Sequence, residues 1–174
     1  MIGSNTLKEV IQVELIKLRE KDINEFKKLM QESFQYGYES VYGSDKEQVL
    51  PDKDIDENLK DPNSHAYEMI DNEKIVGGVI VTINNNNHNH LDFLFVSVGV
   101  QSKGIGQTIW KEIEKLYPNT KVWETCTPYF DKRNIHFYVN KLGFHIVAYY
   151  NKHYPEPNMP EDMWEMYKFQ KVIK

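Results

Sequence analysis

The sequence predicts a single α/β domain built on a mixed sheet, and three observations carry this prediction. Short runs of apolar, β-branched and aromatic residues alternate along the chain with stretches whose apolar residues recur every three or four positions, as in strands and helices. A glycine-containing turn joins one apolar run, residues 90–98, to a regular helical stripe, residues 105–116. No linker-like composition divides the 174 residues, so we expect one domain over residues 1–174.

The elements are expected in the order β-α-α-β-β-β-α-β-α-β-β. A first strand falls within residues 10–18, and Asp22 precedes an amphipathic helix that we expect Gly37 to end. Gly77 and Gly78, inside a later strand, predict a bulge or a bend. The elements after the first helix are a short helix near 54–60, strands over 64–70 and 74–84, the strand and helix around the glycine turn, a strand over 121–127, a helix over 133–142, and strands over 144–150 and 163–172.

The turn between residues 99 and 106 has the composition of an anion site. It contains Gly99, Gly104 and Gly106 and one cation, Lys103. A strand, a glycine turn and a helix in this order aim several backbone N–H groups at one point, where the helix also places the positive end of its dipole. The turn therefore favours a phosphate or pyrophosphate as ligand, with a tight connection that binds nothing as the alternative.

The spacing of the glycines narrows the choice of ligand. The P-loop signature GxxxxGK[ST] is absent, and the third glycine of the dinucleotide fingerprint GxGxxG is missing after Gly106. The pattern Q-x-x-G-x-G is present from Gln101 to Gly106, and its glycines let the backbone approach a diphosphate closely. This stretch resembles the coenzyme A loop of the GNAT superfamily of N-acetyltransferases, which carries [Q/R]-x-x-G-x-[G/A] between a central strand and a helix.

The resemblance extends from about Val13 to Val172, and the segment NIHFYVNKLGF, residues 134–144, is similar to the family's fourth-helix motif. It implies the GNAT fold, a mixed and mostly antiparallel sheet of about six to seven strands flanked by about four helices. It also implies an N-acetyltransferase that transfers an acetyl group from acetyl-CoA to a primary amine of a small molecule, by direct attack in a ternary complex. The alternatives are a GNAT-fold module that binds coenzyme A without transfer activity and, third, a P-loop-like nucleotide binder.

The resemblance also assigns residues to the cofactor. Main-chain groups of Val96, Ser97 and Val98 would hold the pantetheine arm where the family's central strand bulges. A backbone N–H near Val98 would polarise the thioester carbonyl, although an ordinary core strand explains Val96 and Val98 equally well. The other residues expected at the cofactor are Gln101, Ser102, Lys103, Gly104, Ile105, Gly106, Gln107, Asn134 and Tyr138.

Tyr138 and Glu124 are the expected catalytic residues. The family's general acid is a tyrosine four residues before the glycine of the GF pair, whereas Tyr138 stands five residues before Gly143. One residue rotates a helical position by about 100°, so a core tyrosine is the rival interpretation. For the base, Glu124 or Asp92 would accept the proton of the amine, with a solvated strand carboxylate as the alternative for each.

Three further positions have simpler explanations. Cys126 is expected to be a small buried apolar residue, because no Cys/His/acid pattern supports a nucleophile. His88 and His90 lack a third ligand, so we expect no metal site. Asn134 is expected to cap its helix. The aromatic residues that would rim an acceptor pocket, or else lie scattered on the surface, are Tyr36, Tyr38, Tyr42, Tyr149, Tyr150 and Tyr154.

The overall composition bounds the partners. The net charge of -5 argues against nucleic acid or an anionic membrane as the main partner. No apolar run approaches the roughly 20 residues that span a bilayer, and the first ten residues lack the apolar core of a signal peptide. The single cysteine cannot form an internal disulfide, so a cytoplasmic location is the default expectation. A homodimer stays open as an assembly.

Overall fold

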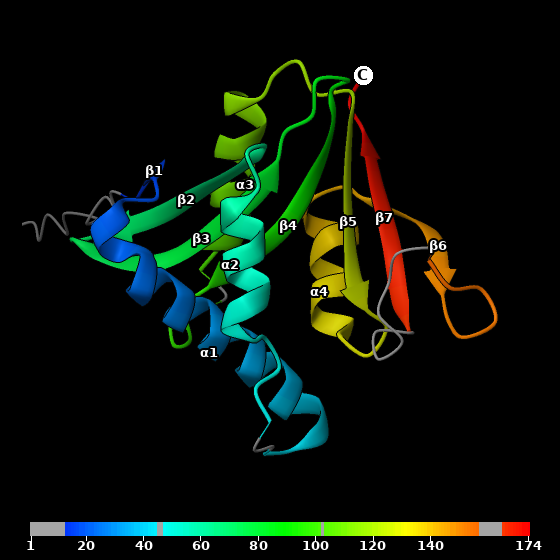
Figure 1. Cartoon of the computed structure of the whole chain (residues 1–174), viewed down its shortest axis with the longest axis horizontal. Helices are drawn as coiled ribbons and strands as arrows, with labels where there is room; N and C mark the ends of the chain where they lie inside the picture. Colours follow the sequence, from blue (N-terminus) through cyan, green and yellow to red (C-terminus); the bar gives the residue numbers. More distant parts are fainter. Residues whose placement is uncertain (1–12, 45–46, 102, 157–164) are drawn as a thin grey trace, which may run out of the picture.

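The computed structural model describes residues 13–44, 47–101, 103–156 and 165–174. Its helices and strands follow one another in the predicted order (Figure 1). They are β1 (Glu14–Lys17), α1 (Ile23–Tyr42), α2 (Asp52–Lys60), β2 (Ser64–Asp71), β3 (Lys74–Thr82), β4 (His88–Val96), α3 (Ile105–Leu116), β5 (Val122–Pro128), α4 (Lys132–His136), β6 (His145–Tyr150) and β7 (Met166–Val172). A 3-10 turn, η1 (Glu20–Asp22), precedes α1, and a π-helical turn, η2 (Phe137–Lys141), continues α4.

The seven strands form one sheet in the order β1-β2-β3-β4-β5-β7-β6. All neighbours are antiparallel except β4 and β5, which run parallel and are joined by only three residue pairs, from His88–Val122 to His90–Glu124. Beyond His90 the two strands part and leave a gap between them, which we call the β4–β5 fork (Figure 1). A mixed, mostly antiparallel sheet flanked by helices is the predicted architecture.

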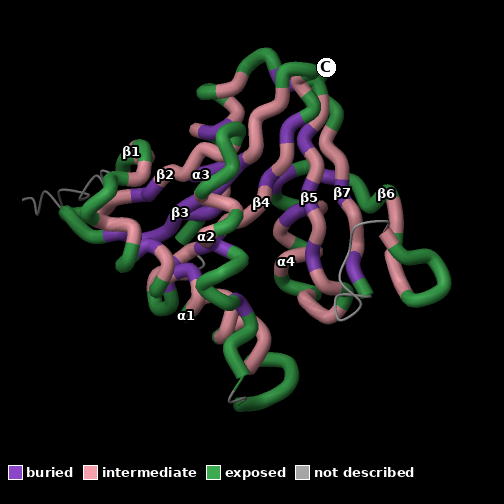
Figure 2. The backbone as a smooth tube through the Cα atoms, in the orientation of Figure 1, coloured by how far each residue is buried: buried purple, intermediate pink, exposed green. Residues whose placement is uncertain are grey.

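Helices cover the two faces of the sheet unequally. On one face, α3 and η2 pack over the central strands, where the Trp110 ring lies 5.1 Å from the Trp123 ring and 5.3 Å from the Phe144 ring. On the other face, α1 and α2 contact β2, β3 and β4, and Phe26 of α1 packs edge-on against Phe95 at 5.1 Å. The buried residues accordingly run through the central strands (Figure 2). No described helix lies in front of β5, β7 and β6 on the α1 face (Figure 1).

The first helix does not end at Gly37, as we had expected from the sequence. It continues to Tyr42 and ends at Gly43, whose φ of 83° lies in the region that favours glycine. The rings of Tyr38 and Tyr42 pack against Phe130 with centroid distances of 5.7 and 5.1 Å. These tertiary contacts outweigh the roughly 1 kcal/mol that an internal glycine costs a helix, and they place the end of α1 beside the fork.

The glycine pair of β3 lies at a bulge, which confirms the prediction for Gly77 and Gly78. The register of β3 against β2 shifts at Val76, next to the pair. A Cβ at Gly78 would stand 2.3 Å from the Phe26 ring, and one at Gly77 would stand 2.7 Å from the carbonyl oxygen of Phe95. Both positions therefore need glycine so that α1 and β4 can approach β3 closely. None of the helices among the described residues is long and apolar enough to cross a membrane.

Candidate active site

A cleft of about 580 Å³ lies along the open side of β4. Its walls are the last residues of β4, the glycine turn with the start of α3, the second half of α1, and α4 with the turn that precedes it. The cleft thus occupies the space that opens when β5 leaves β4, and residues far apart in the sequence meet there.

The cleft side of β4 presents main-chain groups that no strand pairs. The carbonyl oxygen of Val96 faces the cleft, where it accepts hydrogen bonds from the Gln101 amide at 3.3 Å and the Ser33 hydroxyl at 3.1 Å. Both main-chain groups of a strand residue face the same neighbour, and alternate residues face alternate sides, so the N–H and C=O of Leu94 also face the cleft. An extended chain that carries amide groups fits such an edge as an added strand would.

The glycine turn ends in the left-handed residue from which α3 begins. Gly104 is the N-cap of α3 with a φ of 78°, and no side chain caps the helix there. The first N–H groups of an α-helix have no partner within the helix, so those of α3 point into the cleft as an anion site. Gly106 has a different requirement, because a Cβ there would stand 2.8 Å from the Phe137 ring and would separate α3 from η2.

Cations from α4 and η2, rather than Lys103 of the turn, supply positive charge to the cleft. Lys132, Arg133 and Lys141 line it, whereas Lys103 is exposed outside it. The guanidinium of Arg133 donates to Gln101 Oε1 at 3.0 Å, so Gln101 ties the turn to α4 as well as to β4. This convergence of helix start and cations suits a polyanion.

A sequence model of the family described as acetyltransferase (GNAT) family matches residues 23–144, which is more than half of the chain. The chain belongs to the GNAT acetyltransferase family. It is 46% identical over 143 residues to the uncharacterised protein YrkN of Bacillus subtilis, and the match covers 81% of this chain and 77% of that protein.

Solved structures of GNAT proteins share the fold of this chain. A GNAT-family acetyltransferase of Staphylococcus aureus superposes with a TM-score of 0.70 at 17% identity, covering 93% of this chain and 99% of its own. The PaiA N-acetyltransferase of Thermoplasma acidophilum, in complex with coenzyme A, gives 0.66 at 14% identity over 92% and 99%. The spermidine N-acetyltransferase of Vibrio cholerae, in complex with coenzyme A and spermine, gives 0.66 at 14% over 92% and 95%. The predicted GNAT fold is therefore confirmed.

Most of the residues that the GNAT resemblance assigned to the cofactor line the cleft, namely Val96, Gln101, Gly104, Ile105, Gly106, Gln107 and Asn134. The others do not. Ser97 is buried against β3, where its N–H donates to the carbonyl of Val76 at 3.0 Å. Val98 is exposed and faces a neighbouring open groove, and Ser102 lies outside the described residues. Direct contact of any of these residues with the cofactor stays a prediction.

The bulge of the central strand lies at Asp92, so its expected position near Val98 is wrong. The register of β4 against β3 shifts between Ile80 and Val81, which leaves Asp92 as the extra residue. The strand itself ends at Val96. A bulge bends its strand and strengthens the twist, so a bulge two residues after the last β4–β5 pair accounts for the parting of the strands.

A π-helical turn compensates for the extra residue between Tyr138 and Gly143. Within η2 the N–H of Leu142 bonds to the carbonyl of Phe137, five residues earlier, at 3.1 Å. A π turn holds one residue more than an α turn, so it accommodates the extra residue within the helix. In a regular α-helix the same extra residue would rotate the preceding side chains by about 100° relative to those that follow. This arrangement is also one that sequence spacing alone does not reveal.

Tyr138 lies directly behind the fork, in the core. Its ring is 7% exposed and packs against Phe169 at 5.4 Å, and it does not line the cleft. Its hydroxyl bonds to Thr125, whose own hydroxyl donates to the carbonyl of Leu91 at 2.8 Å where β4 and β5 part. Burial raises the pKa of the Tyr138 phenol well above its usual range, so the group is a neutral proton donor. Its catalytic role stays a prediction beside its packing role.

Glu124 lies on the opposite face of the sheet and is held by two partners. The Gln170 amide donates to Oε1 at 2.5 Å, and Lys168 Nζ lies 3.3 Å from Oε2. Burial acts to raise the pKa of Glu124, but the hydrogen bond from Gln170 and the contact with Lys168 outweigh it and hold the pKa below its usual value. Glu124 is therefore charged and a weak base, while its predicted catalytic role stays a prediction.

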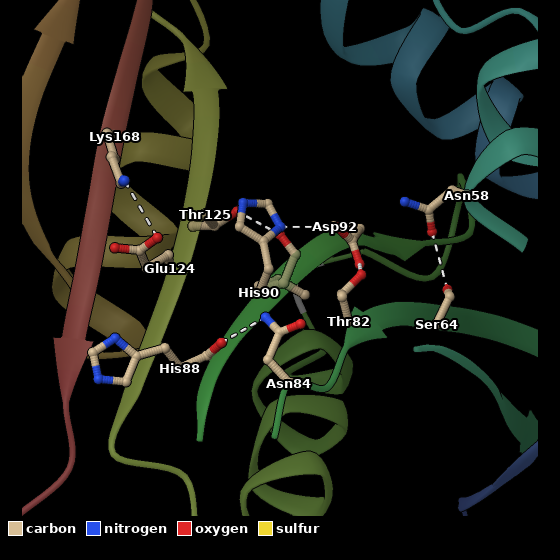
Figure 3. A network of polar contacts seen from close by, with 11 residues as sticks. Asn58, Ser64, Thr82, Asn84, His88, His90, Asp92, Glu124, Thr125 and Lys168 are labelled. Carbon is tan, nitrogen blue, oxygen red and sulfur yellow. Dashed lines mark hydrogen bonds and ion pairs between the residues drawn. The ribbon is translucent and has the colours of Figure 1, made fainter. Parts of the chain in front are cut away.

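His90 and Asp92 form a pair at the tip of the fork, which the sequence analysis missed. His90 Nδ1 lies 2.8 Å from Asp92 Oδ1, and the Thr82 hydroxyl donates to Asp92 Oδ2 at 2.7 Å (Figure 3). Burial lowers the pKa of His90, but its hydrogen bonds with Asp92 and Cys126 outweigh that and raise the pKa to about 9. We call these side chains, with Glu124 and Lys168, the His90 cluster.

Cys126 and Asn134 differ from expectation. Cys126 is partly exposed and contacts His90 on the polar face of β5, because it alternates with the buried Thr125 and Thr127. Asn134 does not cap α4, since the carboxylate of Asp131 accepts its N–H at 2.9 Å. Asn134 is thereby left to line the cleft.

Among the described residues, no group of three or more His, Cys, Asp or Glu side chains is arranged to hold a metal ion.

The tyrosines expected around an acceptor pocket do not gather in one place, since Tyr36 lines the neighbouring open groove and Tyr150 stacks on Tyr154 at 6.1 Å. Tyr38 and Tyr42 pack against Phe130, which lines the cleft, but neither tyrosine lines it. Tyr149 packs on Tyr167 at 5.1 Å on the β6–β7 side of the sheet. Binding of an acceptor at any of these tyrosines stays a prediction.

Proposed function

We propose that this GNAT protein transfers an acetyl group from acetyl-CoA to a primary amine of a small molecule by direct attack in a ternary complex. The observation that carries the proposal is the cleft between the start of α3 and the unpaired edge of β4. Its cationic end suits the diphosphate of coenzyme A, with Lys132 and Arg133 beside the N–H groups of α3. Its other end suits the amide-containing pantetheine arm, through the main-chain groups of Leu94 and Val96.

This placement puts the thioester at the fork, between the Leu94 main chain and Tyr138. The Leu94 N–H, rather than one near Val98, then donates to the carbonyl oxygen as negative charge develops on it. The amine nitrogen bonds to the acetyl carbon, the C–S bond breaks, and the sulfur leaves with a proton that Tyr138 supplies. Tyr138 is buried behind the tip of the fork and is neutral, as this role requires.

A coenzyme A-binding module without transfer activity is the second candidate. The observation that favours it is the position of Tyr138, which is buried and does not line the cleft. In that reading the phenol only packs the core and bonds to Thr125. Ligand binding would be the same as in the enzyme, so only turnover separates the two.

The test has a binding step and a turnover step. Thermal shifts with coenzyme A, acetyl-CoA and ATP come first, and we expect the first two to raise the melting temperature, since a ligand at 100 times its Kd stabilises the native state by about 2.7 kcal/mol. Acetyl-CoA consumption is then measured with spermidine, glucosamine, an amino acid amide and a peptide with a free N-terminus. We expect turnover with an amine and its loss in Tyr138→Phe. Binding without turnover supports the module, and stabilisation by ATP alone refutes both candidates.

A further inference from the structure

We infer that His90, held by Asp92, accepts the proton of the attacking amine, and that the amine approaches on the face of the sheet opposite α3 and η2. This inference rests on the proposed acetyl transfer and assigns to it a base and a direction of approach. Neither was predicted from the sequence, in which His90 stood out only as half of a weak metal pattern.

The direction of the His90 side chain follows from its neighbours. Leu91 and Trp123 are fully buried in the core on the α3 face, so His90 and Glu124, which precede and follow them along their strands, point to the other face. His90 is the last β4 residue paired with β5, where the fork begins. An imidazole there and the Tyr138 phenol behind the same strands would flank a thioester from opposite faces.

The pair has the geometry of an oriented base. Asp92 accepts from His90 on one carboxylate oxygen and from Thr82 on the other, so two strands fix its position (Figure 3). With Nδ1 directed at Asp92, the second ring nitrogen, Nε2, is left to exchange protons with a ligand or with Cys126. The His90 side chain is 38% exposed, and no described helix covers this face of β5 and β7.

The two carboxylates at the fork are weaker candidates. Both oxygens of Asp92 are already engaged. Glu124 is held by Gln170 and Lys168, which stabilise its charged form. A neutral imidazole is therefore the better proton acceptor, and Asp92 acts through it as a positioning residue. The titratable groups that face His90 are Asp92 from β4, Glu124 and Cys126 from β5, and Lys168 from β7 beyond Glu124.

The charge of His90 changes when a cationic acceptor binds beside it. Below pH 9 the free protein holds His90 mainly as an imidazolium. An ammonium group that binds beside it repels this charge and lowers its pKa, which favours loss of a proton from His90 to solvent. Neutral His90 then takes a proton from the ammonium at Nε2 and passes it to solvent, because only the neutral amine has the lone pair that attacks. When the nitrogen bonds to the acetyl carbon, it releases a second proton, which leaves through Nε2 in the same way. Tyr138, which has given its proton to the sulfur, is reprotonated from solvent.

The experiment compares His90→Gln, Asp92→Asn and the control His88→Gln at saturating acetyl-CoA, with the best amine of the panel or, without one, with water as acceptor. His88 is exposed on the same strand and face, two residues away and outside the cluster. We expect His90→Gln to lower kcat by about 10²- to 10⁴-fold, the usual contribution of a general base, with the coenzyme A thermal shift retained. His88→Gln should match the wild type.

The pH dependence separates a base from a structural residue. In the wild type kcat/KM should rise with pH through a midpoint near 9 and level off above it, because only neutral His90 accepts a proton. Asp92→Asn removes the hydrogen bond that raises this pKa, so its profile should level off at a lower pH with a lower plateau. Unchanged turnover in His90→Gln, or an unchanged profile in Asp92→Asn, would overturn the inference.

Two further measurements keep the outcomes distinct. Mass spectrometry after incubation with acetyl-CoA alone should find Cys126 unmodified. An acetylated Cys126, together with an inactive Cys126→Ala variant, would overturn the inference, because His90 would then deprotonate the Cys126 thiol and not the amine. If the wild type binds acetyl-CoA but never turns it over, the proposed function fails instead. In that case spermidine is titrated into the coenzyme A complex and the NMR signals of His90 are followed. If these signals do not shift, the inferred direction of approach of the amine is also wrong.

Discussion

Replacing Gly104 by alanine should weaken coenzyme A binding far more than it weakens the fold. Gly104 has a φ of 78°, so an alanine there is strained by about 1–2 kcal/mol. Part of this is offset because alanine also restricts the unfolded chain, by about 0.4–1 kcal/mol. The added Cβ meets no atom within 4 Å, so no clash adds to the strain. The net loss of stability is then about 1 kcal/mol, or a fall in Tm of about 2–4 °C for a chain of this size.

The affinity should change more, because Gly104 lines the cleft and its added methyl group would project where the proposal places the diphosphate. We expect the Kd for coenzyme A to rise at least about tenfold, which corresponds to 1.4 kcal/mol. Gly99→Ala is the matched control. It has a φ of 91° and open space around its Cβ but does not line the cleft, so it carries the same strain without the steric effect.

Isothermal titration calorimetry and thermal unfolding of both variants provide the test. Equal losses of affinity in Gly104→Ala and Gly99→Ala would mean that strain, rather than occupation of the cleft, weakens binding. An unchanged Kd in Gly104→Ala would refute the placement of the diphosphate at the start of α3. A fall in Tm much larger than 4 °C would show that the turn contributes more to the core than its open surroundings indicate.

Three other perturbations have definite expected outcomes. Gly78→Ala should lower the free energy of unfolding by about 3 kcal/mol in urea titrations, because its Cβ would meet the buried Phe26 ring at 2.3 Å, and even modest overpacking costs about 1–3 kcal/mol. Arg133→Ala should weaken coenzyme A binding at low salt and reduce the salt dependence of the Kd, since an exposed cation acts over a Debye length of about 10 Å at 0.1 M salt. The stabilisation from protonated His90 should be complete below pH 6.5, its unfolded pKa, and lost as the pH rises through about 9. Because the side chain is 38% exposed, screening reduces that loss of stability to about 1 kcal/mol. Urea titrations across this pH range should show a smaller loss of stability in Asp92→Asn than in the wild type.

The element order and the glycine turn could be predicted because both are local. Period-two and period-3.6 patterns depend on residues within one element, and the left-handed conformation of Gly104 depends on its own lack of a Cβ. Gly37 shows the limit of such reasoning. Whether a glycine ends a helix depends on what lies beyond it, and here Tyr38 and Tyr42 meet Phe130 about 90 residues later in the sequence.

The chemistry of the candidate site was harder to predict because it depends on register. His90 and Asp92 alternate along β4 and therefore share a face, but which face this is depends on the register of β4, since a shift of one residue would send both side chains to the opposite face. Whether Cys126 joins them depends on the three residue pairs between β4 and β5, which align His90 with Glu124. The same three pairs determine where the fork begins and, through Thr125, the position of the Tyr138 hydroxyl on the other face. One short parallel pairing therefore positions the predicted acid and the inferred base together, so a change in its register would displace both.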